Sequence, residues 1–408
     1  MSSARPIPLK PLHISILIFG CLIALLSFGP RSTMGFFMTP VTEAHGWGRE
    51  IFALAIALQN LFWGIGQPIA GMVADRFGTY RTLVVGALFY MSGLYLMAEA
   101  TTPLALQLTS GVLIGLGVSG TSMMLVLASF ARLLPENFRT IAFGIGTASG
   151  SLGQFLFAPL GQHFIHQYGW QTALLLFALS LSIVPLLAIV LRGKPGNPTE
   201  TLQVADQTIR QALAEAFGHR SYLLLVAGFF VCGFHVAFIT THLPAFITDV
   251  GIDAKWGAWA IGLIGLFNII GALSSGFLSN RYTLRYSLCF IYSARAAVIA
   301  VFILLPVSTG SILIFSAAMG LLWLSTVPPT QGLVAVMFGT RYLATLFGFV
   351  FLSHQIGAFI GVWLGGVLYD ATGAYEAMWW LSILLGLMAA VLHWPIKEQA
   401  IDRAPVTL

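Results

Sequence analysis

The chain carries, between two long apolar runs, the stretch Gly71-Met-Val-Ala-Asp75-Arg76-Phe-Gly78-Thr-Tyr-Arg81. An acid, two arginines and two glycines stand within it, although only 8% of all residues are charged. A related stretch, Gly276-Phe-Leu-Ser-Asn280-Arg281-Tyr-Thr-Leu-Arg285, follows about 205 residues later. The repetition indicates that the chain is built from two copies of one structural unit.

The composition excludes an ordinary soluble protein, in which about a quarter of the residues are charged. Of the 408 residues, 58% are apolar. The basic residues stand singly and form no basic stripe with interleaved aromatic residues, so we expect no nucleic-acid partner. The three cysteines, Cys21, Cys232 and Cys289, lie inside apolar runs, which favours packing over a disulfide or a metal site.

Twelve apolar runs are long enough to cross a bilayer as helices, which takes about 20 residues each. Inside a bilayer every backbone polar group must be satisfied within its own segment, so we expect an all-α membrane protein with twelve transmembrane helices. The first run is too long for a cleavable signal peptide and is interpreted as a retained span. The predicted spans are 13–39, 50–74, 80–99, 103–131, 138–164, 170–192, 221–248, 256–279, 286–305, 309–338, 342–369 and 375–395.

Lysine and arginine are distributed unequally between the two ends of these spans. Fifteen fall on the side of the N-terminus, whereas only Arg49 and Lys255 fall on the other side. Basic loops stay in the cytoplasm, so both termini are expected to be cytoplasmic. We therefore predict an N-terminal six-helix half at 1–192, a cytoplasmic amphipathic linker at 193–220 and a C-terminal six-helix half at 221–408.

A constant offset relates the two predicted halves. Arg31 of the first span corresponds to His235 of the seventh, 204 residues later. Glycines of the fifth span recur at the same offset in the eleventh, in the pairs Gly144 and Gly348, Gly153 and Gly357, and Gly161 and Gly365. Parallel repeats of six helices are the construction of the Major Facilitator Superfamily.

The stretch at 71–81 resembles the loop motif of that superfamily, Gly-x-x-x-Asp-Arg-x-Gly-x-x-Arg. The resemblance implies a cytoplasmic gate in which Asp75 acts as a latch, meeting an arginine or a helix N-terminus when the transporter faces outward. The alternative for Asp75 is a helix-end charge at the level of the lipid headgroups. The second copy carries Asn280 in place of the acid. The gate residues implied are Gly71, Asp75, Arg76, Gly78, Arg81 and Arg281.

A second resemblance concerns the segment Phe28-Gly-Pro-Arg31-Ser-Thr-Met-Gly35-Phe-Phe-Met-Thr-Pro40, together with the run 57–68. Both look like the bacterial branch of the monocarboxylate transporter family, near the oxalate:formate antiporters, which move small organic anions. The chain departs from this branch because it lacks the family's arginine in span 8 and the antiporter's lysine in span 11. The nearest polar pair in span 11 is His354-Gln355.

Arg31 is the main candidate for substrate binding. A charge inside a span costs from about 2.5 to above 10 kcal/mol, so it normally faces a cavity or a partner. Snorkelling to the interface and pairing with a buried acid are the alternatives, but all fourteen acids fall in loops or at span ends. The planar guanidinium suits a carboxylate bidentately, which favours an anionic substrate.

Two histidines are candidates for proton coupling, because histidine changes its charge near neutral pH. His235 is expected to face Arg31 across the central axis, and His354 lies in span 11. A hydrogen-bonded structural role is the alternative for each.

Other polar residues inside spans could line a central cavity or hold helices together. Arg295 stands apart in a span expected to be peripheral, with backbone carbonyls of a neighbouring span as one candidate partner. The further substrate-binding candidates are Gln59, Trp63, Gln154, Asn268, Trp323, Gln331 and Gln355.

We therefore interpret the chain as a secondary active transporter that moves a small organic anion, a monocarboxylate by preference, by alternating access. Proton coupling and anion exchange both stay open, and an exporter of amphiphilic or drug-like compounds is the alternative function. A sensor and an enzyme are disfavoured, because no appended domain, nucleotide loop or nucleophile–base arrangement is recognisable. We expect no cofactor, no metal and no catalytic residue, and a monomer among the lipids of a bacterial inner membrane.

Overall fold

The computed structural model describes residues 10–192, 207–279, 281–339 and 341–401. Within these ranges the chain forms helices and no strand. The first part contains α1 (Pro11–Ser32), η1 (Met34–Phe37), α2 (Met38–His45), α3 (Arg49–Phe77), α4 (Thr79–Ala98), α5 (Pro103–Leu106), η2 (Gln107–Leu113), α6 (Ile114–Gly120), α7 (Met123–Leu133), α8 (Glu136–Leu181), α9 (Val184–Leu187) and η3 (Ala188–Leu191).

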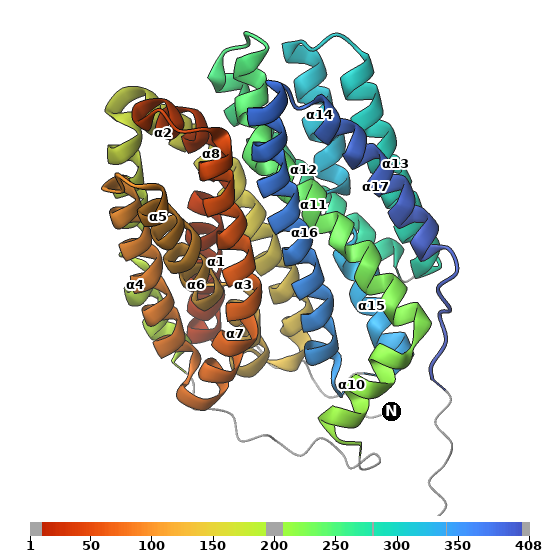
Figure 1. The fold of residues 1–408 in the computed structure, drawn as a ribbon. Helices are drawn as coiled ribbons and strands as arrows, with labels where there is room; N and C mark the ends of the chain where they lie inside the picture. The colour runs from red at the N-terminus through yellow and green to blue at the C-terminus, as the bar shows by residue number, and fades with distance from the viewer. Residues whose placement is uncertain (1–9, 193–206, 280, 340, 402–408) are drawn as a thin grey trace, which may run out of the picture.

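The second part begins with a short helix and continues with longer ones. It contains α10 (Ile209–Gly218), α11 (Arg220–Asp249), α12 (Ala254–Leu278), α13 (Leu284–Leu304), α14 (Thr309–Leu322), α15 (Val327–Phe338), α16 (Leu343–Thr372) and α17 (Glu376–His393). The helices up to η3 and those from α10 onward form two groups that lie side by side (Figure 1). Much of the predicted linker, 193–206, lies outside the described residues, so the boundaries of the halves stay a prediction.

Eleven helical segments of the described chain are long and apolar enough to span a membrane, one fewer than predicted. The difference arises at Ile141–Leu191, a segment of 51 residues that covers two of the predicted spans. A straight helix of that length would measure about 76 Å, against a bilayer core of about 30 Å. Gly169 interrupts it with φ 81° and ψ 163°, a backbone conformation that is not helical. If this interruption divides the segment into two spans, the total is twelve. The number of twelve spans stays a prediction.

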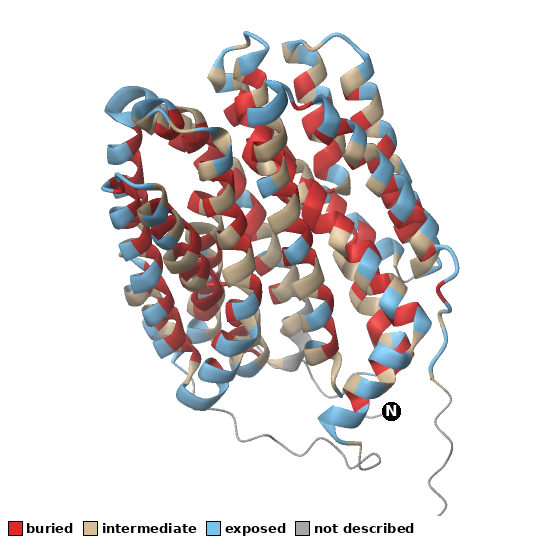
Figure 2. Cartoon of the chain, in the orientation of Figure 1, coloured by how far each residue is buried: buried red, intermediate tan, exposed pale blue. Residues whose placement is uncertain are grey.

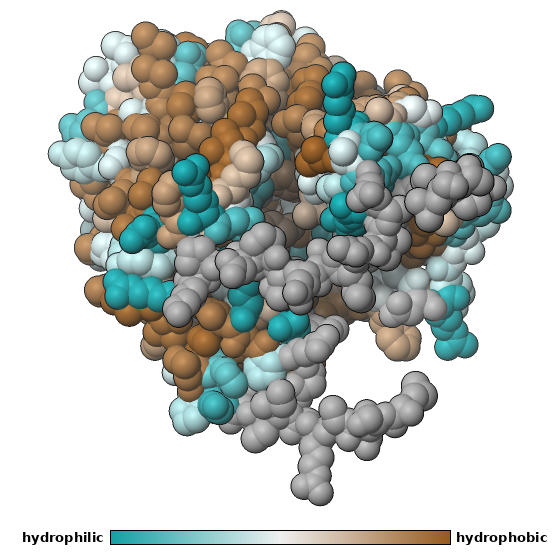
Figure 3. Space-filling model, turned by 90° about the horizontal axis from the view of Figure 1, so that it is seen from below, coloured by the Kyte–Doolittle hydropathy of each residue, from teal (hydrophilic) through white to brown (hydrophobic). Residues whose placement is uncertain are grey.

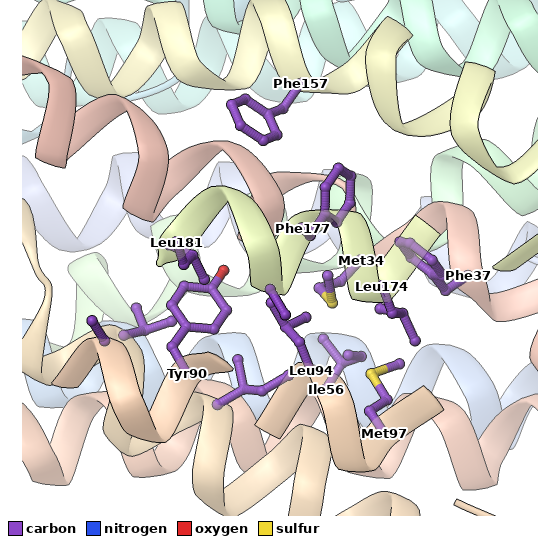
Figure 4. Packing of buried hydrophobic residues seen from close by; sticks show 14 of the residues in the cluster. Met34, Phe37, Ile56, Tyr90, Leu94, Met97, Phe157, Leu174, Phe177 and Leu181 are labelled. Carbon is purple, nitrogen blue, oxygen red and sulfur yellow. The ribbon is translucent and has the colours of Figure 1, made fainter. Parts of the chain in front are cut away.

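The core of the first part lies between α1, α3, α4 and α8. Figure 4 shows Tyr90 and Leu94 of α4 near Ile56 and Phe177, all of which are fully buried. Lipid tails are as apolar as these side chains, so moving a side chain from lipid into the core gains little free energy. The helix contacts are stabilised mainly by close van der Waals packing. Buried residues accordingly lie on the helix faces that turn toward other helices (Figure 2).

The two groups of helices meet along the pairs α3 with α16 and α8 with α12. A Cβ added at Gly366 of α16 would lie 2.6 Å from Ala53 Cβ of α3. A Cβ added at Gly64 of α3 would lie 2.8 Å from Gln355 Cβ of α16. Further along the same pair, a Cβ at Gly71 or at Gly348 would meet no atom within 4 Å. The α3–α16 pair is therefore tight toward one end of the bundle and diverges toward the other.

The pair α8–α12 behaves in the same way. A Cβ at Gly265 would lie 2.8 Å from Ser151 O, whereas one at Gly144 would come no closer than 3.9 Å to Leu273 and one at Gly276 would meet nothing within 4 Å. We call the end where the pairs diverge, which carries Arg76 and α10, the linker face, and the other end the opposite face. Figure 3 shows the linker face, with a hollow between the two groups of helices.

Candidate functional site

Arg31 lies in the last turn of α1, where the two groups of helices meet. Its Nη2 donates a hydrogen bond to Asn60 Oδ1 on α3, and its Cζ lies 4.6 Å from the centre of the Trp63 ring. Its Nε has no hydrogen-bond partner. None of the ion pairs in the described part of the chain involves Arg31. The guanidinium thus has neutral partners, and its buried Nε–H donor is free.

A small cavity adjoins the guanidinium. It has a volume of about 10 Å³, roughly the space of one water molecule. Any ligand larger than a water molecule therefore needs the surrounding helices to move before it can bind here. The lining comes from both groups of helices and consists of Arg31, Met34, Gly35, Ile56, Gln59, Asn60, Ala237, Thr240 and Thr241.

Gly35 closes this cavity toward the opposite face. It lies in η1, and a Cβ built on it would lie 2.7 Å from Thr241 O and still closer to Thr240 O of α11. Only a residue without a side chain allows the two backbones this approach. We call the contact of Gly35 with Thr240 and Thr241 the backbone plug.

Trp63 covers Arg31 on its other side. It lies one helical turn nearer the linker face than Asn60, and its ring packs edge-on against Phe351 of α16, with ring centres 5.6 Å apart. Arg31 is therefore enclosed between the backbone plug and a pair of aromatic rings contributed by both groups.

The opposite face is held shut by charged residues that the sequence did not single out as a site. Arg49 forms two hydrogen bonds of 2.7 Å to the Asp249 carboxylate, and its Nη1 donates to Tyr375 OH at 3.0 Å. Asp370 accepts the backbone N–H groups of Arg49 at 2.9 Å and Glu50 at 2.8 Å. The first N–H groups of a helix lack partners within it and favour a negative charge. Asp370 on α16 thus caps α3 from the other group of helices.

We call Arg49, Asp249, Asp370 and Tyr375 the opposite-face lock. One signal in the sequence could have indicated it, because Arg49 is one of only two basic residues predicted for that side. The two acids that bind it lie 200 and 321 positions further along the chain, and no local pattern connects them.

Asn60 links Arg31 to the predicted residues of α16. Gln355 Nε2 donates to Asn60 O at 3.2 Å, and Gln355 Oε1 lies 3.0 Å from His354 Nδ1. Of the predicted residues, Trp63 contacts Arg31 directly, whereas Gln355 and His354 are joined to it through Asn60. Asn60 itself was not predicted. The available signal was an amide inside a span, one turn from Trp63.

The expected position of His235 opposite Arg31 is wrong. Its ring is fully buried, and Nε2 lies 2.8 Å from Ser382 O of α17. His235 does not line the cavity beside Arg31. Equivalent positions in the two repeats therefore do not point to the same place, because α11 turns this side chain into its own group of helices.

Three predicted amides hold helices together. Gln59 Nε2 donates to Ser110 O at 3.0 Å, and Gln59 also lines the cavity beside Arg31. Gln154 Nε2 donates to Ile261 O at 2.9 Å, and Asn268 Nδ2 donates to Ser151 Oγ at 2.8 Å. The last two contacts join α8 to α12 across the two groups.

Trp323 and Gln331 are not brought to Arg31. The Trp323 side chain is 2% exposed within the apolar cluster of the second part, and Gln331 is half-buried on α15 outside the cavity lining.

Arg295 has the partners that were suggested for it. Its Nε and Nη2 donate to Leu322 O at 3.1 and 2.7 Å, and Nη2 also donates to Trp323 O. These carbonyls stand at the C-terminal end of α14, where helical hydrogen bonding stops and a cation is favoured.

The predicted gate residues lie at the linker face. Asp75 pairs with Arg132 of α7 at 2.9 Å, and Arg132 also donates to Thr79 Oγ1 at 2.5 Å. Gly78 separates α3 from α4 with φ 92°, which explains the glycine there. Arg76, Arg81 and Arg281 are exposed. Asp75 therefore pairs within its own group of helices, and a latch across the groups stays a prediction.

Comparisons with known proteins agree with this architecture. A model of the Major Facilitator Superfamily matches residues 20–361. The chain is 24% identical over 395 residues to the uncharacterized MFS-type transporter YcxA of Bacillus subtilis (strain 168), covering 93% of each chain. It is 26% identical over 368 residues to monocarboxylate transporter 13 of Rattus norvegicus, covering 89% of this chain and 82% of that protein.

A solved structure has the same fold. The crystal structure of the D-xylose-proton symporter matches with a TM-score of 0.75 at 14% sequence identity, covering 95% of this chain and 99% of that one. The helical bundle, the motif at 71–81 and these matches lead to one conclusion: the chain is a multi-pass membrane transporter that belongs to the Major Facilitator Superfamily.

Proposed function

We propose that this transporter is a secondary active carrier of a small organic anion, a monocarboxylate, and that Arg31 binds the carboxylate. The observation that carries the proposal is a guanidinium enclosed between the two groups of helices with a free Nε and without a carboxylate partner. Such a charge is costly inside a membrane unless an anion compensates it. Relatives named monocarboxylate transporters support the substrate class.

The contacts at the two faces support alternating access around Arg31. The backbone plug and the opposite-face lock close one side, whereas α3–α16 and α8–α12 diverge toward the other. We place the linker face in the cytoplasm of a bacterium, in keeping with the predicted positive-inside orientation. In the reverse state the lock opens, and Asp75 acts as the latch at the linker face.

His354 is the residue that we favour for proton coupling. It is joined to Arg31 through Gln355 and Asn60 by contacts of 3.0 and 3.2 Å and the Arg31–Asn60 hydrogen bond. His354 Nδ1 donates to Gln355 Oε1, so a further proton adds at Nε2 and places a positive charge on the ring beside Gln355, next to the anion. Anion exchange without a proton is the other mode that this site supports.

Uptake into proteoliposomes tests the proposal. Labelled monocarboxylates are offered to the wild type, to Arg31→Gln and to Arg220→Gln, which removes an exposed arginine at the start of α11. We expect uptake by the wild type and by Arg220→Gln, and its loss in Arg31→Gln. Equal uptake by Arg31→Gln would refute the site, and no uptake of any organic acid by the wild type would refute the function.

A further inference from the structure

A groove far from Arg31 opens on the side of the second group of helices. It has a volume of about 490 Å³, within the range of about 300–1,000 Å³ that is typical of ligand pockets. Its walls are α12 and α13, which both pack against α14 and α15. Its floor is formed by Leu321, Leu322 and Ser325, where α14 ends before α15 begins.

The groove has exposed apolar side chains on helices that are predicted to cross the membrane. Leu278 and Leu321 are 41% and 40% exposed, and Phe290 is 70% exposed. All three line the groove and belong to segments that are apolar enough to span the membrane. Inside a bilayer the groups that reach such a surface are lipid chains.

The end of the groove toward the linker face is polar and basic. Tyr282, Thr283 and Tyr286 bring hydroxyl groups to the lining, and the exposed Arg281 precedes Tyr282. Arg285 Nη2 donates to Tyr286 OH at 3.1 Å, while its backbone N–H is bound by the Glu398 carboxylate at 3.2 Å. Neither arginine belongs to the lining, but two arginines against one acid give the residues around the mouth a net positive charge.

We propose that the groove binds an anionic phospholipid. One acyl chain lies along Leu278, Phe290 and Leu321, and the phosphate lies at the mouth, beside Arg281 and the hydroxyl groups of Tyr282 and Thr283. Basic pockets between transmembrane helices on the cytoplasmic side are suited to anionic headgroups. The combination of an apolar channel with a basic, hydroxyl-bearing mouth distinguishes this occupant from a neutral detergent or a neutral lipid.

The position of the floor gives the bound lipid a structural consequence. Ser275 Oγ donates to Ser325 O at 2.5 Å, and Asn268 Oδ1 accepts from Leu324 N at 3.0 Å. Asn268 also reaches Ser151 on α8 in the other group of helices. A lipid seated on Ser325 therefore contacts the interruption between α14 and α15, which is tied to the interface of the two groups.

Native mass spectrometry of the purified full chain tests the proposal, with phosphatidylglycerol and phosphatidylcholine offered in equal amounts. Ser274→Trp fills the groove, because Ser274 is an exposed part of its lining. Phe277→Trp is the matched control, on the same helix and 71% exposed but outside the lining. Arg281→Gln removes a charge at the mouth while leaving the groove open.

We expect the wild type and Phe277→Trp to retain phosphatidylglycerol in preference to phosphatidylcholine, and Ser274→Trp to retain neither. Arg281→Gln should lower the preference about fivefold, since one basic residue near anionic lipid contributes about that factor. Equal retention by Ser274→Trp and the wild type would show that lipid binds elsewhere. An unchanged preference in Arg281→Gln, or displacement of the lipid by a neutral amphiphile alone, would overturn the anionic assignment.

Discussion

Gly35 determines how closely the first and second groups of helices approach beside Arg31. Its contact with Thr240 and Thr241 is one of backbone against backbone, so no rotamer change can make room for a side chain. Gly348, in contrast, is a helical glycine of α16 with open space where its Cβ would be. The two positions thus form a matched pair for testing the backbone plug.

We predict that Gly35→Ala destabilises the conformation closed at the opposite face by about 1–3 kcal/mol, the usual cost of overpacking. Distances between spin labels at Ala44→Cys and Val250→Cys, with the native cysteines replaced by serine, should lengthen because the plug no longer forms. Both label sites are exposed near the opposite face, one in each group of helices. Gly348→Ala should leave the distances unchanged, and an unchanged distribution in Gly35→Ala would contradict the role of the plug.

At the scale of elements, the interruption between α14 and α15 explains an arginine that is fully buried. A helix that stops inside the membrane leaves carbonyls without partners, and water is absent there to satisfy them. Arg295 binds two of these carbonyls with charged donors. Its role is thus structural, whereas Arg31 keeps a donor free.

The two arginines should therefore respond differently to substitution. We predict that Arg295→Leu lowers the stability of the protein by about 1–3 kcal/mol, because Leu322 O and Trp323 O lose their donors. A carboxylate at 100 times its dissociation constant should still add about 2.7 kcal/mol. Arg31→Gln should lose that gain at little cost in stability. Thermal unfolding with and without the anion measures both effects, and loss of the gain in Arg295→Leu alone would reverse the assignment.

At the scale of the whole molecule, we expect the opposite-face lock to set the balance between conformations. It joins the start of α3 to the ends of α11 and α16, so it must open as one unit when the opposite face opens. Capping contacts of this kind are worth about 0.5–2 kcal/mol each. A change of that size is enough to shift two states of similar free energy.

We predict that Asp370→Ala lengthens the distance between labels at Ala44→Cys and Val250→Cys, because α3 loses its cap from α16. Asp253→Ala is the control, since Asp253 caps α12 within its own group by accepting from Lys255 N at 2.9 Å. That variant should lose helix stability without changing the distance. If the distance lengthened equally in both variants, loss of a helix cap would explain the effect, and the role of Asp370 in joining the two groups of helices would be contradicted.

The sequence by itself determined the membrane class, the helical architecture, the repeat and the buried arginine, because a bilayer allows only long apolar helices and makes every charge inside them conspicuous. Only the tertiary structure decided which side chains meet. Helices rotate about their own axes when they pack, so His235 turned to Ser382 although it is the repeat of Arg31, and Asn60 became the link to Gln355. The lock joins Arg49 to acids 200 and 321 positions away. Such contacts depend on how two packed groups of helices are docked, which no pattern along one chain records.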